Sequence, residues 1–152
     1  MRDFQMNLLA RDLMGIQAFL DEFDPPANGE DREVELNSTN EAVVIRNFPL
    51  PDAYDPEFID VLVLVPDYPA RPPIGIYLLE NEQNADVIGQ LRRIFNVMQT
   101  AFYGAPTVPG FAWICVHYQG DAWRFNPDHL ASGDNLRKFF INFFNRLQME
   151  TV

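Results

Sequence analysis

The arrangement of this chain follows from residues 58–73, which read FIDVLVLVPDYPARPP. The first half, residues 58–65, is rich in β-branched residues and predicts a central strand. The second half holds four prolines in eight residues. Because each proline fixes its own φ, this half predicts one rigid connection to a following strand. Tyr68 lies within the connection, where a hydrogen-bonded hydroxyl can anchor it against the sheet. A stiff loop with no further role is the simpler alternative.

Upstream of this stretch, the sequence predicts a helix followed by two strands. Apolar residues recur at helical spacing at Leu9, Leu13, Ile16, Leu20 and Phe23. Pro25 and Pro26 then end the helix, because proline cannot continue it. Residues 32–36 and 42–48 are typical of the two strands of a hairpin. The chain is therefore expected to pass from a helix into an antiparallel meander.

Downstream of the prolines, the sequence predicts a further strand and a further helix. Residues 74–79 are expected to form the fourth strand of the meander. Residues 87–102 carry the apolar period of a helix, with Asn84 as its cap and Gly104 as its stop.

The last third of the chain predicts a loop, a short apolar run and a final helix. Residues 111–118 are apolar with an aromatic bias, and residues 136–147 are typical of an amphipathic helix capped by Ser132 or Asp134. The whole of residues 1–152 is expected to be a single α+β domain, in which helices flank a four-stranded antiparallel sheet.

Composition narrows the classes of function. With 47% hydrophobic and 22% charged residues, the chain is expected to be globular. Its 22 acidic residues against 11 basic ones oppose binding to nucleic acid or anionic lipid and suit a partner with a basic patch. With no apolar run of about 20 residues and no signal peptide, a soluble cytoplasmic protein is expected.

The same counts exclude several kinds of site. One cysteine cannot form an internal disulfide, and two histidines without a clustered carboxylate pattern do not predict a metal centre. There is no phosphate-binding Gly-x-x-x-x-Gly-Lys loop and no Gly-x-Gly-x-x-Gly turn. No metal and no cofactor are therefore expected.

Two motifs of this chain resemble those of ubiquitin-conjugating enzymes. Tyr68-Pro69-Ala70-Arg71-Pro72-Pro73 is similar to the family's Tyr-Pro-x-x-Pro-Pro loop. Ile114-Cys115-Val116 is similar to the motif bearing its acceptor cysteine, and Trp123 follows eight positions later at the family's spacing. The closer likeness is to the bacterial ubiquitin-conjugating-like families, which carry phrases similar to residues 44–51 and to His117 followed by Ala122-Trp123-Arg124.

The resemblance implies the fold of that family and a thioester carrier. A ubiquitin-like protein would pass from an activating enzyme to Cys115 and then to an amine. The bacterial families further imply a deconjugating metallopeptidase from the same gene set and a role in anti-phage defence. Three departures bear on catalysis. Residues 105–107 read Ala-Pro-Thr where the eukaryotic family has His-Pro-Asn, and additional residues lie before Cys115 and over residues 126–133.

The lone cysteine has two interpretations. A cysteine in an apolar stretch is often a packing residue, whereas a thioester carrier needs an accessible thiolate. His117 lies two positions later, so in an extended strand both side chains project to the same face, about 7 Å apart. An imidazole there would accept the thiol proton or stabilise the thiolate; the alternative is a structural histidine.

Three further residues are candidates for the site. Thr107 has a hydroxyl that can donate to a developing oxyanion, although a turn is its simpler role. Asp128 and His129 lie in the later insertion, where Asp128 could hold an acceptor amine and His129 could act as a second base. Both are also typical of a solvated loop.

Two other functions compete with a conjugating enzyme. The missing His-Pro-Asn triplet favours a non-catalytic scaffold of the same fold that binds a ubiquitin-like protein or its activating enzyme. A cysteine hydrolase using Cys115 and His117 lacks a recognisable third group to orient the histidine. Lys138 is the chain's only lysine. An acyl carrier benefits from few competing amines, but compositional drift explains the scarcity equally well.

Overall fold

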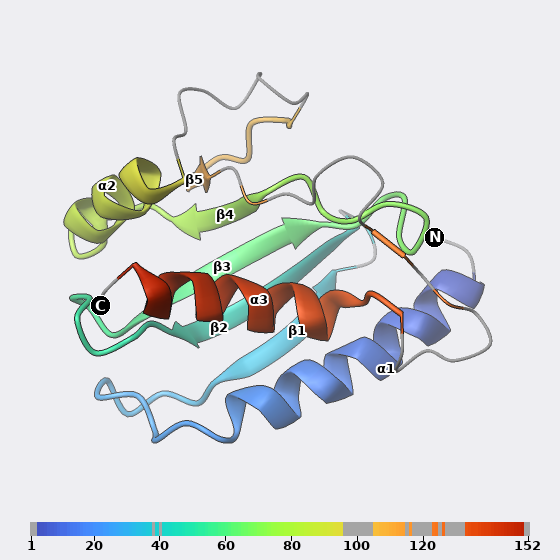
Figure 1. Cartoon of the computed structure of the whole chain (residues 1–152), viewed down its shortest axis with the longest axis horizontal. Coiled ribbons are helices and arrows are strands. Elements are labelled where there is room, and N and C mark those ends of the chain that lie inside the picture. Colours follow the sequence, from blue (N-terminus) through green and yellow to red (C-terminus); the bar gives the residue numbers. More distant parts are fainter. Residues whose placement is uncertain are drawn as a thin grey trace.

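The computed structural model describes residues 3–37, 39, 41–95, 105–114, 116, 123, 124, 126 and 133–150. Within these residues it is an α+β structure of three helices and one five-stranded antiparallel sheet (Figure 1). The elements in chain order are α1 (Asp3–Leu20), β1 (Glu33–Asn37), β2 (Ala42–Pro49), β3 (Phe58–Leu64), β4 (Ile76–Leu79), α2 (Ala85–Ile94), β5 (Phe111–Ile114) and α3 (Leu136–Met149).

The sheet has the strand order β1-β2-β3-β4-β5, which confirms the predicted meander and corrects its length. The prediction of four strands was wrong, because residues 111–114 form a fifth strand that pairs with β4. Ile76 lies opposite Ile114 and Leu79 opposite Phe111. A run of four apolar residues is too short for periodicity to distinguish a strand from a loop. Residues 111–114 become a strand because the edge of β4 supplies their hydrogen-bond partners.

One face of the sheet carries the main core. Helices α1 and α3 lie over this face (Figure 1). They run in the same direction, since Asp12 of α1 contacts the start of α3 at Leu136 and Phe19 contacts Phe144 further along, with ring centroids 6.0 Å apart. The phenylalanines of α3 fill the space between helix and sheet, as the predicted amphipathic pattern requires.

The opposite face of the sheet carries a smaller apolar cluster. Its buried members are Ala42, Leu62, Tyr77, Ala105 and Trp113. The segment 105–108 covers this cluster, and Tyr77 holds it by donating its hydroxyl to the carbonyl of Pro106 at 2.5 Å. The predicted loop before the cysteine is thus packed against the sheet in its described part.

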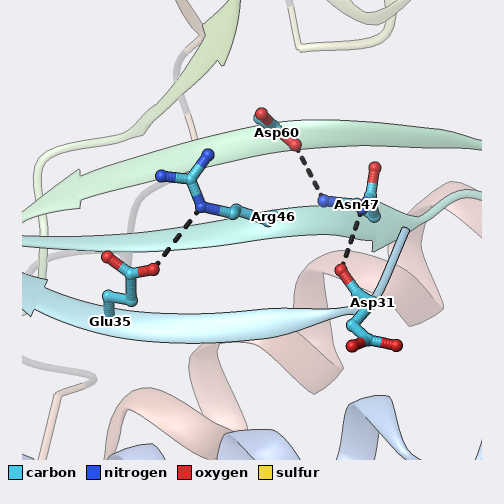
Figure 2. A network of polar contacts seen from close by, with 5 residues as sticks. All are labelled: Asp31, Glu35, Arg46, Asn47 and Asp60. Atoms are coloured by element: carbon cyan, nitrogen blue, oxygen red, sulfur yellow. Dashed lines mark hydrogen bonds and ion pairs between the residues drawn. The ribbon is translucent and has the colours of Figure 1, made fainter.

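Strand β2 contains a bulge at Asn47, which shifts the register between Ile45 and Phe48. Asn47 has φ of +58°, a conformation that asparagine tolerates better than most residues. Figure 2 shows its polar contacts: the backbone N–H donates to Asp60 at 2.8 Å, and the side chain donates to the carbonyl of Asp31 at 3.0 Å. Beyond the bulge, the fully buried Phe48 packs against Phe143 of α3, so this residue of the phrase 44–51 has a packing role.

The helix ends differ in part from the predicted ones. The N-cap of α3 is Asn135, whose side chain accepts from the N–H of Lys138 at 2.9 Å; Asp134 is not the cap, and Ser132 lies outside the described residues. Asn84 lies at the predicted cap position of α2, but its side chain donates to the carbonyl of Leu79 instead.

Helix α2 is shorter than predicted. It ends at Ile94 with Phe95 as its C-cap, and the predicted continuation to Phe102, with Gly104 as the stop, lies outside the described residues. In the part of the chain that the structure describes, no helix combines the length and apolar character needed to cross a membrane.

Candidate functional site

The proline segment, defined here as residues 66–73, connects β3 to β4 as predicted. Its anchor is Tyr68, which is 2% exposed. The Tyr68 hydroxyl donates to the carboxylate of Asp12 on α1 and lies 3.3 Å from the backbone N of Leu136, the first residue of α3. Pro73 is buried and Pro69 and Pro72 are half-buried. Through Tyr68, the proline segment is therefore bonded to α1 and to the start of α3.

Trp123 contacts the same segment from a distant part of the sequence. Its indole Nε1–H donates to the carbonyl of Pro69 at 2.8 Å. Its ring meets that of Tyr68 edge to face, with centroids 6.2 Å apart, a favoured aromatic geometry. Tyr68, Pro69 and Trp123, which sequence reasoning selected as parts of separate motifs, are thus brought together.

Strand β5 and the residue Val116 contact Ile74 and Gly75, the two residues that follow the proline segment. Trp113 donates its indole N–H to the carbonyl of Ile74 at 2.7 Å, and the N–H of Gly75 donates to the carbonyl of Val116 at 3.0 Å. Gly75 has φ of +78°, and a Cβ at this position would collide with the Trp113 indole. Only glycine therefore lets β5 approach this closely.

The two described residues that flank Cys115 are fixed by these contacts. Ile114 is the last residue of β5 and is fully buried, and Val116 is bonded to Gly75. Trp123, at the far end of the intervening chain, is bonded to Pro69. Val116 therefore lies beside Gly75, just after the proline segment, and Trp123 lies beside Pro69 within that segment.

A cavity of about 200 Å³ lies beside the proline segment on the Tyr77 face of the sheet. Its lining is mainly apolar and includes Leu64, Pro66, Pro72, Ile74, Tyr77 and Pro106. Burial raises the pKa of Tyr77 to about 12, so its hydroxyl stays protonated and bonded to Pro106. Thr107 follows Pro106 directly, is exposed, and is not one of the lining residues.

Asp12 is a site residue that sequence reasoning missed. Its Oδ2 accepts from the Tyr68 hydroxyl and, at 3.2 Å, from the N–H of Leu136. Burial raises the pKa of this carboxyl above its ordinary value of 3.8, and the two hydrogen bonds and Arg11 offset part of the rise. A signal was present, because Asp12 follows the buried Leu9 by three positions and precedes the buried Ile16 by four, which places a carboxylate on the buried stripe of the helix.

Five residues are predicted to carry the chemistry, and four of them, Cys115, His117, Asp128 and His129, lie outside the described residues. Thr107 is described, and the roles of all five stay predictions. The lone lysine, Lys138, donates its Nζ to the carbonyl of Gly133 at 2.7 Å.

Within the described residues, no three His, Cys, Asp or Glu side chains are grouped so that they could hold a metal ion. The comparisons with known proteins add no relative: no family model, no curated protein and no solved structure matches this chain.

Proposed function

We propose that this protein is a ubiquitin-conjugating-like enzyme that carries a bacterial ubiquitin-like protein as a thioester on Cys115 and transfers it to an amine. The fold we propose is that of the ubiquitin-conjugating family, with β5 and α2 as additions to its meander. The proposed partners are the ubiquitin-like protein, its activating enzyme and a deconjugating metallopeptidase, in an anti-phage conjugation system of the cytoplasm.

The observation that carries the proposal is the bond between Trp123 and Pro69. The resemblance joins a proline loop, a cysteine and a tryptophan that are far apart in the sequence. The described members of that set meet: Trp123 donates to Pro69 and packs on Tyr68, and Val116, next to the cysteine, is bonded to Gly75. This grouping is the one that the resemblance implies, and it supports the proposed fold and carrier.

In the proposed reaction, the Cys115 thiolate attacks the thioester carbonyl that links the modifier to its activating enzyme. The new thioester forms on Cys115 and the activating enzyme leaves as a thiolate. An amine then attacks the same carbonyl, an amide forms, and the Cys115 sulfur leaves with its electron pair. Thioesters release their acyl group readily, so the protein supplies mainly positioning and oxyanion support.

The proton transfers in this scheme need a base and a donor. We assign the base to His117, with His129 and Asp128 as candidates for contacting the incoming amine. Thr107 is the candidate oxyanion donor. Its exposure in the described structure leaves the hydroxyl accessible to a bound acyl group.

The alternative function is a scaffold that binds the ubiquitin-like protein or the activating enzyme without chemistry. The observation that favours it is the segment 105–107. Ala105 is buried, and Pro106 is bonded to Tyr77 through its backbone, so this segment supplies packing rather than the amide of a His-Pro-Asn triplet.

One assay separates these functions. The protein is incubated with the cognate activating enzyme, ATP and ubiquitin-like protein, and an adduct that reductant cleaves is expected. Cys115→Ala should abolish it, and Cys115→Ser should give an adduct that resists reductant or none. Lys138→Arg is the matched control, because it removes the only lysine amine and should leave the thioester unchanged.

The other outcomes identify the alternatives. Binding without any adduct in the wild type would exclude a carrier and support the scaffold. Cleavage of a preformed conjugate without ATP would instead indicate a cysteine hydrolase. For the carrier, His117→Ala is expected to slow formation or discharge of the thioester, and undiminished rates would remove the assignment of this histidine as base.

A further inference from the structure

Asp12 is a half-buried carboxylate on which three separate segments converge. It belongs to α1, it accepts from the Tyr68 hydroxyl of the proline segment, and it accepts from the first N–H of α3 at Leu136. The N-terminus of α3 favours a negative charge, because the first backbone N–H groups of a helix have no partner within it. Asp12 thus supplies to α3 a capping contact that comes from another helix.

The contacts continue from this carboxylate towards the segment of the lone cysteine. The Tyr68 ring, fixed at its hydroxyl by Asp12, packs edge to face on Trp123. The next residue of the segment, Pro69, accepts from the Trp123 indole. Gln5, about two turns before Asp12 on α1, donates its side-chain amide to the carbonyl of Tyr68 at 2.8 Å and so contacts the backbone of the same residue.

We propose that Asp12 is a positioning residue that acts on Trp123 through Tyr68. The proposal depends on the proposed function only for its meaning in conjugation. The coupling of α1 to Trp123 runs through contacts of the folded chain and can be measured without a modifier.

The local charges support a role in holding rather than in reacting. Arg11 is the charged side chain that favours the ionised carboxyl from α1 itself. On α3, Arg137 packs its side chain over Gly15, about one turn further along α1. Both hydrogen bonds that Asp12 accepts come from neutral groups, Tyr68 and Leu136. The carboxylate of Asp12 is therefore engaged in the contact between α1, the proline segment and the start of α3.

The test uses the single thiol as a reporter. Iodoacetamide alkylation of the folded wild type, Asp12→Ala, Asp12→Asn and Tyr68→Phe is timed at one pH. Trp123 follows Cys115 by eight positions, so releasing its contacts should change the reactivity of the thiol. Asp12→Ala is expected to change the rate about fivefold, and Asp12→Asn should recover most of the wild-type rate. Asp12→Ala combined with Tyr68→Phe should differ from the wild type no more than Asp12→Ala alone.

Trp123 provides a second readout. The difference in emission between each protein and its Trp123→Phe counterpart reports that indole alone, and Asp12→Ala should shift it to longer wavelength. Asp21→Asn is the matched control, since Asp21 lies just after α1, is exposed and accepts a hydrogen bond from the side chain of Gln17. It should leave both readouts at wild-type values, and circular dichroism checks that each variant is folded.

The outcomes separate this proposal from the function. If Asp12→Ala and Tyr68→Phe leave both the alkylation rate and the Trp123 emission unchanged, or if the effects of Asp12→Ala and Tyr68→Phe simply add, the proposal is wrong. If the wild-type thiol does not react at all, the proposed function fails while the Trp123 emission still decides the coupling. A folded Asp12→Ala with wild-type thioester formation but slower discharge would support both.

Discussion

The two ends of the sheet are built by different kinds of contact. At one end, the bulge at Asn47 is stabilised by Asp31, by Asn28 and by Asp60 on the neighbouring strand, all within 19 positions of it in sequence. At the other end, Tyr68 contacts Asp12, Leu136 and Trp123, and each of these lies more than 50 positions away. The first end is therefore a local feature of the strands, whereas the second joins parts of the whole chain.

This difference decides what a substitution should change. A change at the bulge end is expected to lower stability without altering the thiol, because the polar partners of Asn47 lie before β1 and on β3, away from the proline segment. A change at the proline end is expected to alter stability and thiol reactivity together.

The largest effect is expected from Phe48→Ala at the bulge end. Phe48 is fully buried and contacts Phe140 and Phe143, with centroids 5.8 and 5.5 Å away. Truncation leaves a cavity and should lower the free energy of unfolding by about 4 kcal/mol, as measured by urea denaturation. The alkylation rate of the native thiol should stay at the wild-type value. A faster rate would show that the two ends are not independent.

Gly75→Ala is expected to cost about 3 kcal/mol. It combines a positive φ with a collision against Trp113 and the Ile114 carbonyl. Gly29→Ala is a close control, because Gly29 has φ of +77° but open space around it, and it should cost only about 1 kcal/mol. Urea denaturation compares the two. Equal losses would mean that the backbone conformation alone, and not the approach of β5, accounts for the effect.

Tyr68→Phe should have a smaller effect on stability. The variant keeps the ring and its contact with Trp123 but removes the hydroxyl, leaving the half-buried Asp12 with one donor fewer. A loss of about 1–2 kcal/mol in the free energy of unfolding is expected, together with a change in the alkylation rate. A stability loss with an unchanged rate would place Tyr68 with the bulge residues, as packing only.

The smallest effect is a pH dependence that comes from Asp12. Because burial raises its pKa in the folded state above 3.8, the folded protein binds its proton more tightly than the unfolded chain. The contribution of Asp12 to stability is therefore largest at low pH and is lost as the pH rises through the raised pKa, after which it stays constant.

The measurement compares free energies of unfolding of the wild type and Asp12→Asn across this range. The difference, wild type minus variant, should fall as the pH rises from about 3.8 and then level off. Besides burial, the groups that act on this pKa are the Tyr68 hydroxyl, the N–H of Leu136 and the charge of Arg11, and all three lower it. A difference that grows with pH would mean that the bonds from Tyr68 and Leu136 outweigh burial.

The sequence predicts the parts of this structure that depend on local patterns. The strand before Pro66, the proline segment itself and the amphipathic α3 follow from β-branching, fixed φ and apolar spacing. The bulge at Asn47 is harder to foresee, because nothing in the pattern around residue 47 specifies a positive φ. The fifth strand depends on the free edge of β4, which is a property of the assembled sheet.

The residues of the candidate site can be predicted from the sequence, but the contacts between them cannot. Tyr68, Pro69 and Trp123 are recognisable as motif residues, yet their mutual contacts depend on packing across 54 or more positions. Asp12 is harder still, since an acidic residue in a helix normally faces solvent. Its partners are a tyrosine and a helix terminus that no local pattern connects to it.

The close contact between Gly75 and Trp113 restricts which substitutions evolution can accept at either position. A lineage that gains any side chain at position 75 first acquires a clash with a large ring, so the change is tolerable only after residue 113 has become smaller. Homologues, once aligned, are therefore expected to show these two columns varying as a pair, with glycine accompanying every bulky aromatic.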